Sequence, residues 1–285
     1  MNTASHRQPL RDFIALLRPF NAAIAFLGIL AAGFMAAGAI RVELPLLLAA
    51  FAGTFIGMAG NIHNDVCDIA IDRINKPRRV LAAGRIDARS ATLLAAVFAA
   101  VGAILSLFIS PTATTIALVS IALLYVYNIA LKHIALAGNV VVGAVTGAAF
   151  LYGAEAMGNM EAGIMPGMFA FLVNVGREII KDVEDIKGDA AAGARTLPIL
   201  LGARKATAVA AVLLLTVALV SFLPDIRERY NQHFSDHIIF VHLFIGYAIS
   251  SAIGIGAKSN PRKAATILKW AMLAGIVVLT LGSIP

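Results

Sequence analysis

Two short acidic stretches in an otherwise apolar chain contain the side chains best suited to chemistry. They span residues 64–77 and 177–189 and hold eight of the 16 acidic residues in a sequence of 285. Each stretch directly follows an apolar run. Carboxylates at the edge of hydrocarbon are costly, so a functional role is the default interpretation there.

The spacing within the two stretches is the same. The first set is Asn64, Asp68 and Asp72, and the second set is Lys181, Asp185 and Asp189. Residues that recur every four positions lie along one face of an α-helix. Asp185 follows Asp68 by 117 residues, and Asp189 follows Asp72 by the same interval. Two such carboxylate faces, brought together, would suit a divalent metal ion with a diphosphate.

The oxygen-rich character of both faces favours Mg²⁺ as the cofactor. This ion usually takes one or two carboxylates together with substrate phosphates. Basic side chains near both faces would neutralise the same diphosphate, namely Lys76, Arg78, Arg79, Arg177 and Lys181. An apolar bundle beside the site would hold a long hydrocarbon tail, so the expected substrate is an isoprenyl diphosphate. Ordinary surface loops with a few helix ion pairs are the alternative, but they do not explain two sets of matched spacing.

Composition predicts that the chain that contains these motifs is an all-α integral membrane protein. Hydrophobic residues make up 60% of the chain and charged residues 14%, against about 25% charged in soluble domains. A spanning helix needs about 20 apolar residues. Nine runs approach or reach this length, at 20–40, 44–62, 90–109, 113–131, 134–152, 162–180, 206–223, 237–257 and 264–285. No linker divides the chain, so we expect a single domain over residues 1–285.

The net charge of +7 could suggest a nucleic-acid partner, but the distribution of the charge argues against one. With nine helices and a cytoplasmic N-terminus, 19 of the 23 Lys and Arg residues fall in or beside cytoplasmic segments. Arg41, Arg227 and Arg229 face outside, and Lys269 lies within the last run. This is the positive-inside bias of a multi-pass cell-membrane protein. It places the C-terminus outside and both acidic stretches on the cytoplasmic side.

The motifs resemble those of the UbiA superfamily of intramembrane prenyltransferases. Residues 64–77 read N-D-x-x-D-x-x-x-D-x-x-N-K-P, residues 182–189 read D-x-x-D-x-x-x-D, and residues 18–21 read R-P-x-N. The resemblance implies nine transmembrane helices around a central cavity, a cytoplasmic-side cap, and Mg²⁺-dependent transfer of a prenyl chain from its diphosphate. It also implies a set of metal and diphosphate residues, with the aspartates at 68, 72, 185 and 189 as the catalytic ones: Asn64, Asp68, Asp72, Asp182, Asp185 and Asp189.

The segments at 177–189 and 195–198 resemble most closely the branch of the superfamily whose acceptor is a lipid phosphate. That resemblance implies transfer of a geranylgeranyl group to the glycerol hydroxyl of geranylgeranylglyceryl phosphate, which forms the second ether bond of archaeal membrane lipids. An aromatic acceptor such as 4-hydroxybenzoate, used by the same chemistry, is the alternative. A secondary transporter is a more distant one, because transporters usually carry their charges at the membrane midplane.

Five further residues are candidates for the cavity or the acceptor site: Arg18, Asn21, Tyr125, Asn128 and Asn139. Arg18 could reach a phosphate of the acceptor. Tyr125 could offer its ring face to an allylic cation, or it could simply pack. Asn139 could line the cavity or form an interhelical hydrogen bond. The base for the acceptor proton stays open between Asp65, Asp68 and the diphosphate product, and the oligomeric state stays open as well.

Overall fold

The part of the chain that the structure describes forms nine long apolar helices, which indicate a multi-pass membrane protein. A computed structural model describes residues 7–256 and 258–285. Within these residues the only strand-like pairing is an isolated bridge between Ile134 and Arg195. The long helices are α2 (Pro19–Ala37), α3 (Leu44–Cys67), α5 (Ala88–Ser106), α6 (Pro111–Val126), α7 (Ala137–Glu155), α8 (Ile164–Ala191), α10 (Ala203–Val220), α12 (Gln232–Ile253) and α13 (Pro261–Ser283).

The expected nine spans are confirmed, because each predicted apolar run overlaps one long helix in the described residues. The run at 237–257 ends on a residue that lies outside the described part. Two irregular turns extend the spans. A π-helical turn, η1 (Tyr127–Leu131), continues α6, and a 3₁₀ turn, η2 (Met160–Gly163), precedes α8.

Local sequence signals explain where the helices begin. Proline occupies the first turn of α2, α3, α6 and α13, where its missing N–H is not needed. A side chain also caps the first turn of α5, α6 and α13 by accepting a hydrogen bond from a backbone N–H. Asp87 accepts from Ser90 (2.8 Å), Ser110 from Ala113 (3.0 Å), and Asn260 from Lys263 (2.9 Å).

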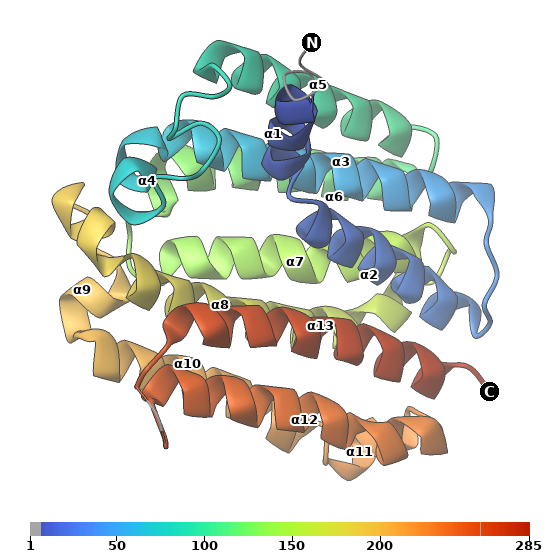
Figure 1. The fold of residues 1–285 in the computed structure, drawn as a ribbon. Helices are drawn as coiled ribbons and strands as arrows, with labels where there is room; N and C mark the ends of the chain where they lie inside the picture. The colour runs from blue at the N-terminus through green and yellow to red at the C-terminus, as the bar shows by residue number, and fades with distance from the viewer. Residues whose placement is uncertain (1–6, 257) are drawn as a thin grey trace.

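The long helices run side by side in one bundle (Figure 1). Four short helices complete it: α1 (Arg7–Leu17), α4 (Ile69–Asn75), α9 (Leu197–Leu201) and α11 (Pro224–Glu228). Helices α4 and α9 both lie at the left end of the bundle in Figure 1. Glycine allows close helix contacts, since a Cβ on Gly147 of α7 would meet the carbonyl oxygen of Gly167 of α8 at 2.8 Å.

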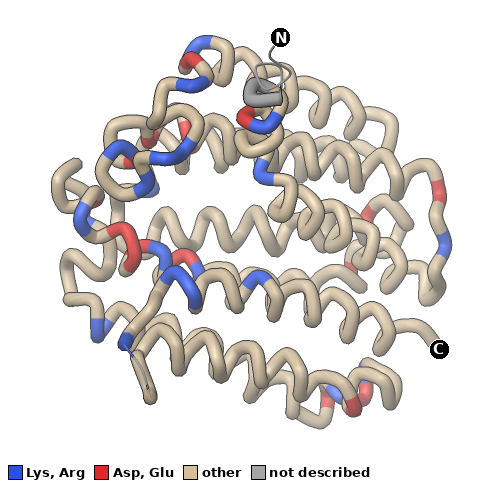
Figure 2. Tube along the Cα trace, in the orientation of Figure 1, with Lys and Arg blue, Asp and Glu red and all other residues tan. Residues whose placement is uncertain are grey.

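Apolar side chains cover the outside of the bundle, whereas charged ones collect at one end. Large hydrophobic residues such as Leu93, Leu219 and Leu243 are more than 60% exposed, as expected for side chains that face lipid. Figure 2 shows that most charged residues gather at the end that holds α4 and α9, and that fewer lie at the opposite end. The bundle therefore has one strongly polar end, and the two acidic motifs are part of it.

Candidate active site

The first acidic motif begins on α3 and continues onto α4. Helix α3 ends at Cys67, and Asp68 has φ −96° and ψ 7°, so a bend separates α3 from α4 within this motif. Backbone hydrogen bonds nevertheless cross the junction, from Asp68 N to Asn64 O (2.9 Å) and from Asp72 N to Asp68 O (2.7 Å). Asn64, Asp68 and Asp72 therefore keep one common side, while the bend turns α4 toward α8.

The second acidic motif lies on one unbroken helix. Helix α8 runs to Ala191. Asp182, Asp185 and Asp189 therefore lie on the side of its last turns that faces the first motif, as the spacing predicts. These carboxylates and those of the first motif line the same small pocket, with a volume of about 80 Å³. The 117-residue interval between the two motifs thus corresponds to one site in space.

The amide of Asn75 fastens α4 to α8. Its Nδ2 donates to the carbonyl oxygen of Asp185 (3.0 Å), and its Oδ1 accepts from the backbone N–H of Gly188 (2.9 Å). A Cβ on Gly188 would lie 2.6 Å from the Asn75 Cγ, so a larger residue at this point of α8 would displace the Asn75 amide. This pair of hydrogen bonds fixes the register between the two motifs.

Basic side chains alternate with the carboxylates around the pocket. Lys76 Nζ contacts Asp185 (2.6 Å to Oδ1), and Arg79 Nη1 contacts Asp72 (2.6 Å to Oδ2). Lys132 forms an ion pair with Asp68. Burial raises the pKa of Asp72, while the neighbouring Arg79 guanidinium opposes that shift. Each of these carboxylates therefore has a cation beside it.

The donor set of the pocket fits a hard divalent cation that is shared with a substrate. Within residues 7–256 and 258–285, no three His, Cys, Asp or Glu side chains are close enough to hold one ion alone. Mg²⁺ does not need such a cage, because it keeps waters and takes substrate phosphate oxygens. Asn64 donates its Nδ2 to Asp68 (2.9 Å), which leaves its amide oxygen as a further hard ligand. One or two carboxylates per ion, from α4 and α8, fit this chemistry.

A larger, mostly apolar cavity adjoins the carboxylate pocket. Its volume is about 590 Å³, and its walls come from α2, α3, α6, α7, α8, α10, α12 and α13. Six residues border both spaces, which makes the pocket the mouth of the cavity: Arg18, Asn64, Arg79, Tyr127, Glu178 and Lys181. A ligand with a charged head and a long tail would therefore find both environments in contact.

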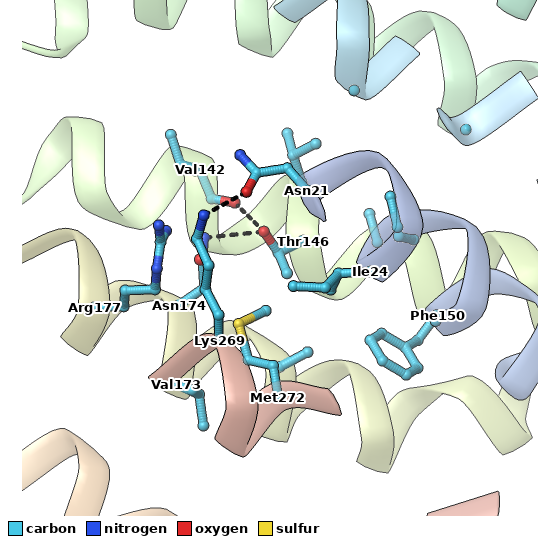
Figure 3. Close-up of a pocket in the computed structure, with 18 of the residues that line it drawn as sticks. Asn21, Ile24, Val142, Thr146, Phe150, Val173, Asn174, Arg177, Lys269 and Met272 are labelled. Atoms are coloured by element: carbon cyan, nitrogen blue, oxygen red, sulfur yellow. Dashed lines mark hydrogen bonds between the residues drawn. The ribbon is translucent and has the colours of Figure 1, made fainter. Parts of the chain in front are cut away.

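A few polar groups interrupt the apolar wall (Figure 3). Lys269 Nζ donates to Asn21 Oδ1 (2.6 Å), and Asn174 Nδ2 donates to Thr146 Oγ1 (2.9 Å). Arg177 lies near them and donates its Nε to the carbonyl oxygen of Ala265 (3.3 Å). The cavity thus holds a local polar patch beside Met272, Ile24 and other hydrocarbon.

Most of the residues expected at the site lie there. Lys76, Arg79 and Lys181 border the carboxylate pocket. Arg18, Asn21 and Asn128 border the cavity, and the Arg18 guanidinium also forms an ion pair with Asp65. Asn139 lies just behind, where its Nδ2 donates to Asp182 Oδ2 (2.8 Å).

Three expected residues lie elsewhere. Tyr125 is 57% exposed, stacks on His63 with ring centroids 4.9 Å apart, and does not line the cavity. Arg78 is exposed and borders neither space. Arg177 borders the apolar cavity rather than the carboxylate pocket. Tyr127, the first residue of η1, faces the pocket in place of Tyr125.

Sequence reasoning missed the contacts that four residues make in this region. Glu178 is buried between Arg177 (2.7 Å) and Lys181 (2.5 Å). It precedes Asp185 by seven residues, two helical turns, and that spacing could have identified it. Lys132 was not among the expected site residues, Asp65 was considered only as a base, and Lys269 was noted only as a charge within a span.

The fold and the site together define a membrane-embedded helical enzyme for amphiphilic substrates, with a polar mouth on an apolar cavity. The family model described as the UbiA prenyltransferase family matches residues 25–278, and the chain belongs to this family.

Relatives and solved structures agree with this assignment. The digeranylgeranylglyceryl phosphate synthase of Thermococcus gammatolerans is 42% identical over 216 residues, which are 75% of this chain and 78% of that protein. A structure described as giving insights into "the biosynthesis of Digeranylgeranylglyceryl phosphate synthase in membranes" is 31% identical with a TM-score of 0.72, over 97% of this chain and 99% of that one.

A further structure, of a UbiA homolog from Archaeoglobus fulgidus bound to GPP and Mg²⁺, shares the fold. Its TM-score is 0.63 at 22% identity, over 94% of this chain and 99% of that chain. A divalent metal and a prenyl diphosphate are thus found together in a protein of this fold.

Proposed function

We propose that the protein transfers a geranylgeranyl group from geranylgeranyl diphosphate to the glycerol hydroxyl of geranylgeranylglyceryl phosphate, with Mg²⁺ as cofactor. The product is the double ether lipid of archaeal membranes. The observation that carries this proposal is the meeting of two carboxylate motifs in one pocket, at the mouth of a cavity of about 590 Å³. The names of the relatives support the choice of acceptor.

The charges of the pocket suit a diphosphate leaving group. Lys76 and Lys132 each lie against one carboxylate and Arg79 against two, so oxygen ligands and hydrogen-bond donors surround the same space. Mg²⁺ held by the carboxylates would supply Lewis-acid neutralisation of the departing diphosphate. The basic side chains would donate hydrogen bonds to its oxygens as negative charge develops there, which is the largest expected catalytic term.

The adjoining cavity suits the remaining steps. The bond between C1 and the diphosphate oxygen breaks, and the acceptor hydroxyl oxygen forms a bond to C1. The ring of Tyr127, which borders both spaces, can face the developing allylic cation. The hydroxyl proton leaves to a pocket carboxylate or to the diphosphate product. The apolar walls hold the hydrocarbon chains and keep water away from the cation.

The orientation in the cell membrane follows from the same substrate. A diphosphate head does not cross hydrocarbon, so the end of the bundle with α4 and α9 faces the cytoplasm, where isoprenyl diphosphates occur. The charge asymmetry of the described residues supports this side (Figure 2). The N-terminus is then cytoplasmic and the C-terminus outside. One shared cavity supports a single domain over residues 1–285.

A single reaction tests the proposal. Purified protein with Mg²⁺ receives radiolabelled geranylgeranyl diphosphate and either geranylgeranylglyceryl phosphate or 4-hydroxybenzoate. We expect the label in the double ether lipid only. Label in the aromatic product instead would establish the alternative acceptor, and neither product, together with uptake into proteoliposomes, would indicate a transporter.

A further inference from the structure

The polar patch of the large cavity contains a lysine that the diphosphate site does not use. Lys269 lies eight residues after the first residue of α13, about 12 Å along the helix axis and thus inside the membrane span. It borders the cavity, donates to Asn21, and forms no ion pair within the described part of the chain. A cation at such depth is costly, which makes it a functional candidate.

Arg177 accompanies Lys269 from the neighbouring helix. Its Nε donates to the carbonyl oxygen of Ala265, which lies one turn before Lys269 on α13. Figure 3 shows the Arg177, Lys269 and Asn21 side chains directed to the same region of the cavity. Three elements, α2, α8 and α13, therefore present hydrogen-bond donors to one place.

The charge of this patch matches one particular ligand group. The charged groups around Lys269 are Arg177, Lys181, Arg18 and the carboxylate Glu178. Glu178 is paired with Arg177 and Lys181, and Arg18 is paired with Asp65. Four cations and two anions leave two positive charges in excess. A phosphomonoester carries nearly two negative charges near neutral pH. A free carboxylate or a neutral alcohol would balance less of this charge.

The centre of the patch, formed by Asn21, Arg177 and Lys269, lies apart from the metal and diphosphate pocket. Arg177, Asn21 and Lys269 border only the large cavity, whereas Asp185 borders only the carboxylate pocket. On α8 the Arg177 Cα precedes that of Asp185 by eight residues, about 12 Å along the axis. Such a separation leaves room for the reacting hydroxyl and the C1 carbon between two bound phosphate groups, with the reacting atoms about 3 Å apart.

We propose that Lys269, Arg177 and Asn21 form a second anion site, which binds the phosphomonoester of the lipid acceptor. This inference rests on the proposed function and refines it. Selectivity for a phosphorylated acceptor would arise here, because an acceptor without the phosphate leaves the partly buried Lys269 amine without an anionic partner. When no acceptor is bound, Asn21 holds the lysine amine in place. The ring of Phe20, 5.5 Å from Nζ, faces the same amine.

The test compares Lys269→Met, Lys269→Arg and the control Lys263→Met, an exposed position on the same helix. KM is measured for geranylgeranylglyceryl phosphate, for geranylgeranylglycerol and for geranylgeranyl diphosphate. Lys269→Met should raise the KM of the phosphorylated acceptor about 10- to 100-fold, the range for a lost hydrogen bond to a charged group. The KM of the diphosphate should stay within about twofold, and Lys269→Arg should recover part of the loss.

A binding measurement in EDTA removes the dependence on turnover. The phosphorylated acceptor should raise the Tm of the wild-type protein and of Lys263→Met, but much less that of Lys269→Met, and geranylgeranylglycerol should raise none of them. Excess glycerol phosphate should compete with the phosphorylated acceptor for this site, because both carry the phosphate group that the site binds.

Two results would overturn the inference: an unchanged acceptor KM in Lys269→Met, or an equal loss with the phosphorylated and the unphosphorylated acceptor. Failure of the proposed function looks different, since the wild-type protein would then form no double ether lipid at all.

Discussion

The contact between Asn75 and Gly188 allows a sharp test of how the two motifs are held together. Asn75→Ala removes two hydrogen bonds between α4 and α8. Each contributes about 0.5–1.5 kcal/mol, so the free energy of unfolding should fall by about 1–3 kcal/mol. Since the bonds also set the distance between the carboxylate sets, kcat/KM should fall about 10- to 100-fold, the cost of a displacement near 1 Å.

Gly188→Ala breaks the same contact from the other side. The new Cβ would lie 2.6 Å from Asn75 Cγ and 2.7 Å from its Oδ1, and both distances are too short for real atoms. The single substitution should therefore cost about as much as Asn75→Ala. In the Asn75→Ala background the obstacle is gone, so the added methyl group should do little further harm. The coupling free energy between the two positions should be about 1–3 kcal/mol.

The assay is a double-mutant cycle on kcat/KM for prenyl transfer, with Tm measured on the same samples. Gly246→Ala on α12 is the matched control, because a Cβ there meets nothing within 4 Å, and it should behave like the wild-type protein. Additive losses in the double variant would refute the reasoning, since they would mean that Gly188 matters for a reason unrelated to Asn75.

Three further predictions concern the site and its orientation. Replacing any one of Asp68, Asp72, Asp185 and Asp189 by asparagine should lower kcat at least about 100-fold without loss of folded protein, whereas Glu161→Gln should stay near the wild-type rate. Wild-type turnover in Asp185→Asn would contradict the two-motif site. Excess EDTA should abolish transfer and added Mg²⁺ should restore it, and full activity in EDTA would count against a metal-bound diphosphate. Single cysteines in a Cys67→Ser background test the orientation with an impermeant thiol reagent. Cysteines at the exposed positions Ala83 and Lys187 should react only in inverted vesicles, and one at Asn159 only in right-side-out vesicles. Labelling of Ala83 and Lys187 from opposite sides would exclude a shared site.

Hydropathy was sufficient to find the spans, because hydrocarbon permits only helices or closed barrels and long apolar runs without alternation favour helices. The residues of the second motif could also be placed, since α8 is regular and four-residue spacing keeps Asp185 and Asp189 on one side. At the first motif the same spacing gave no sign of the bend at Asp68. The backbone hydrogen bonds continue across the bend, so the residues keep a helical spacing.

Other features depend on contacts that spacing does not contain. The choice between Tyr125 and Tyr127 depends on which face of α6 meets the cavity, and Tyr127 shares that face with Ser120 and Leu124. Lys132 pairs with Asp68 across 64 residues of chain, a tertiary contact without a local signal. Lys269 was visible as an isolated charge in an apolar run, and only the structure identifies Asn21 and Arg177 as its neighbours.

The central claim is that both carboxylate motifs hold the same metal–diphosphate unit. Its most direct test is calorimetric binding of the unreactive analogue geranylgeranyl thiolodiphosphate, with and without Mg²⁺, to the wild-type protein, Asp72→Asn on α4 and Asp189→Asn on α8. We predict tight binding only with Mg²⁺, and at least about tenfold weaker binding in each variant, because each removes a charged ligand from the shared site. Wild-type affinity in Asp189→Asn, or binding that ignores Mg²⁺, would contradict the claim.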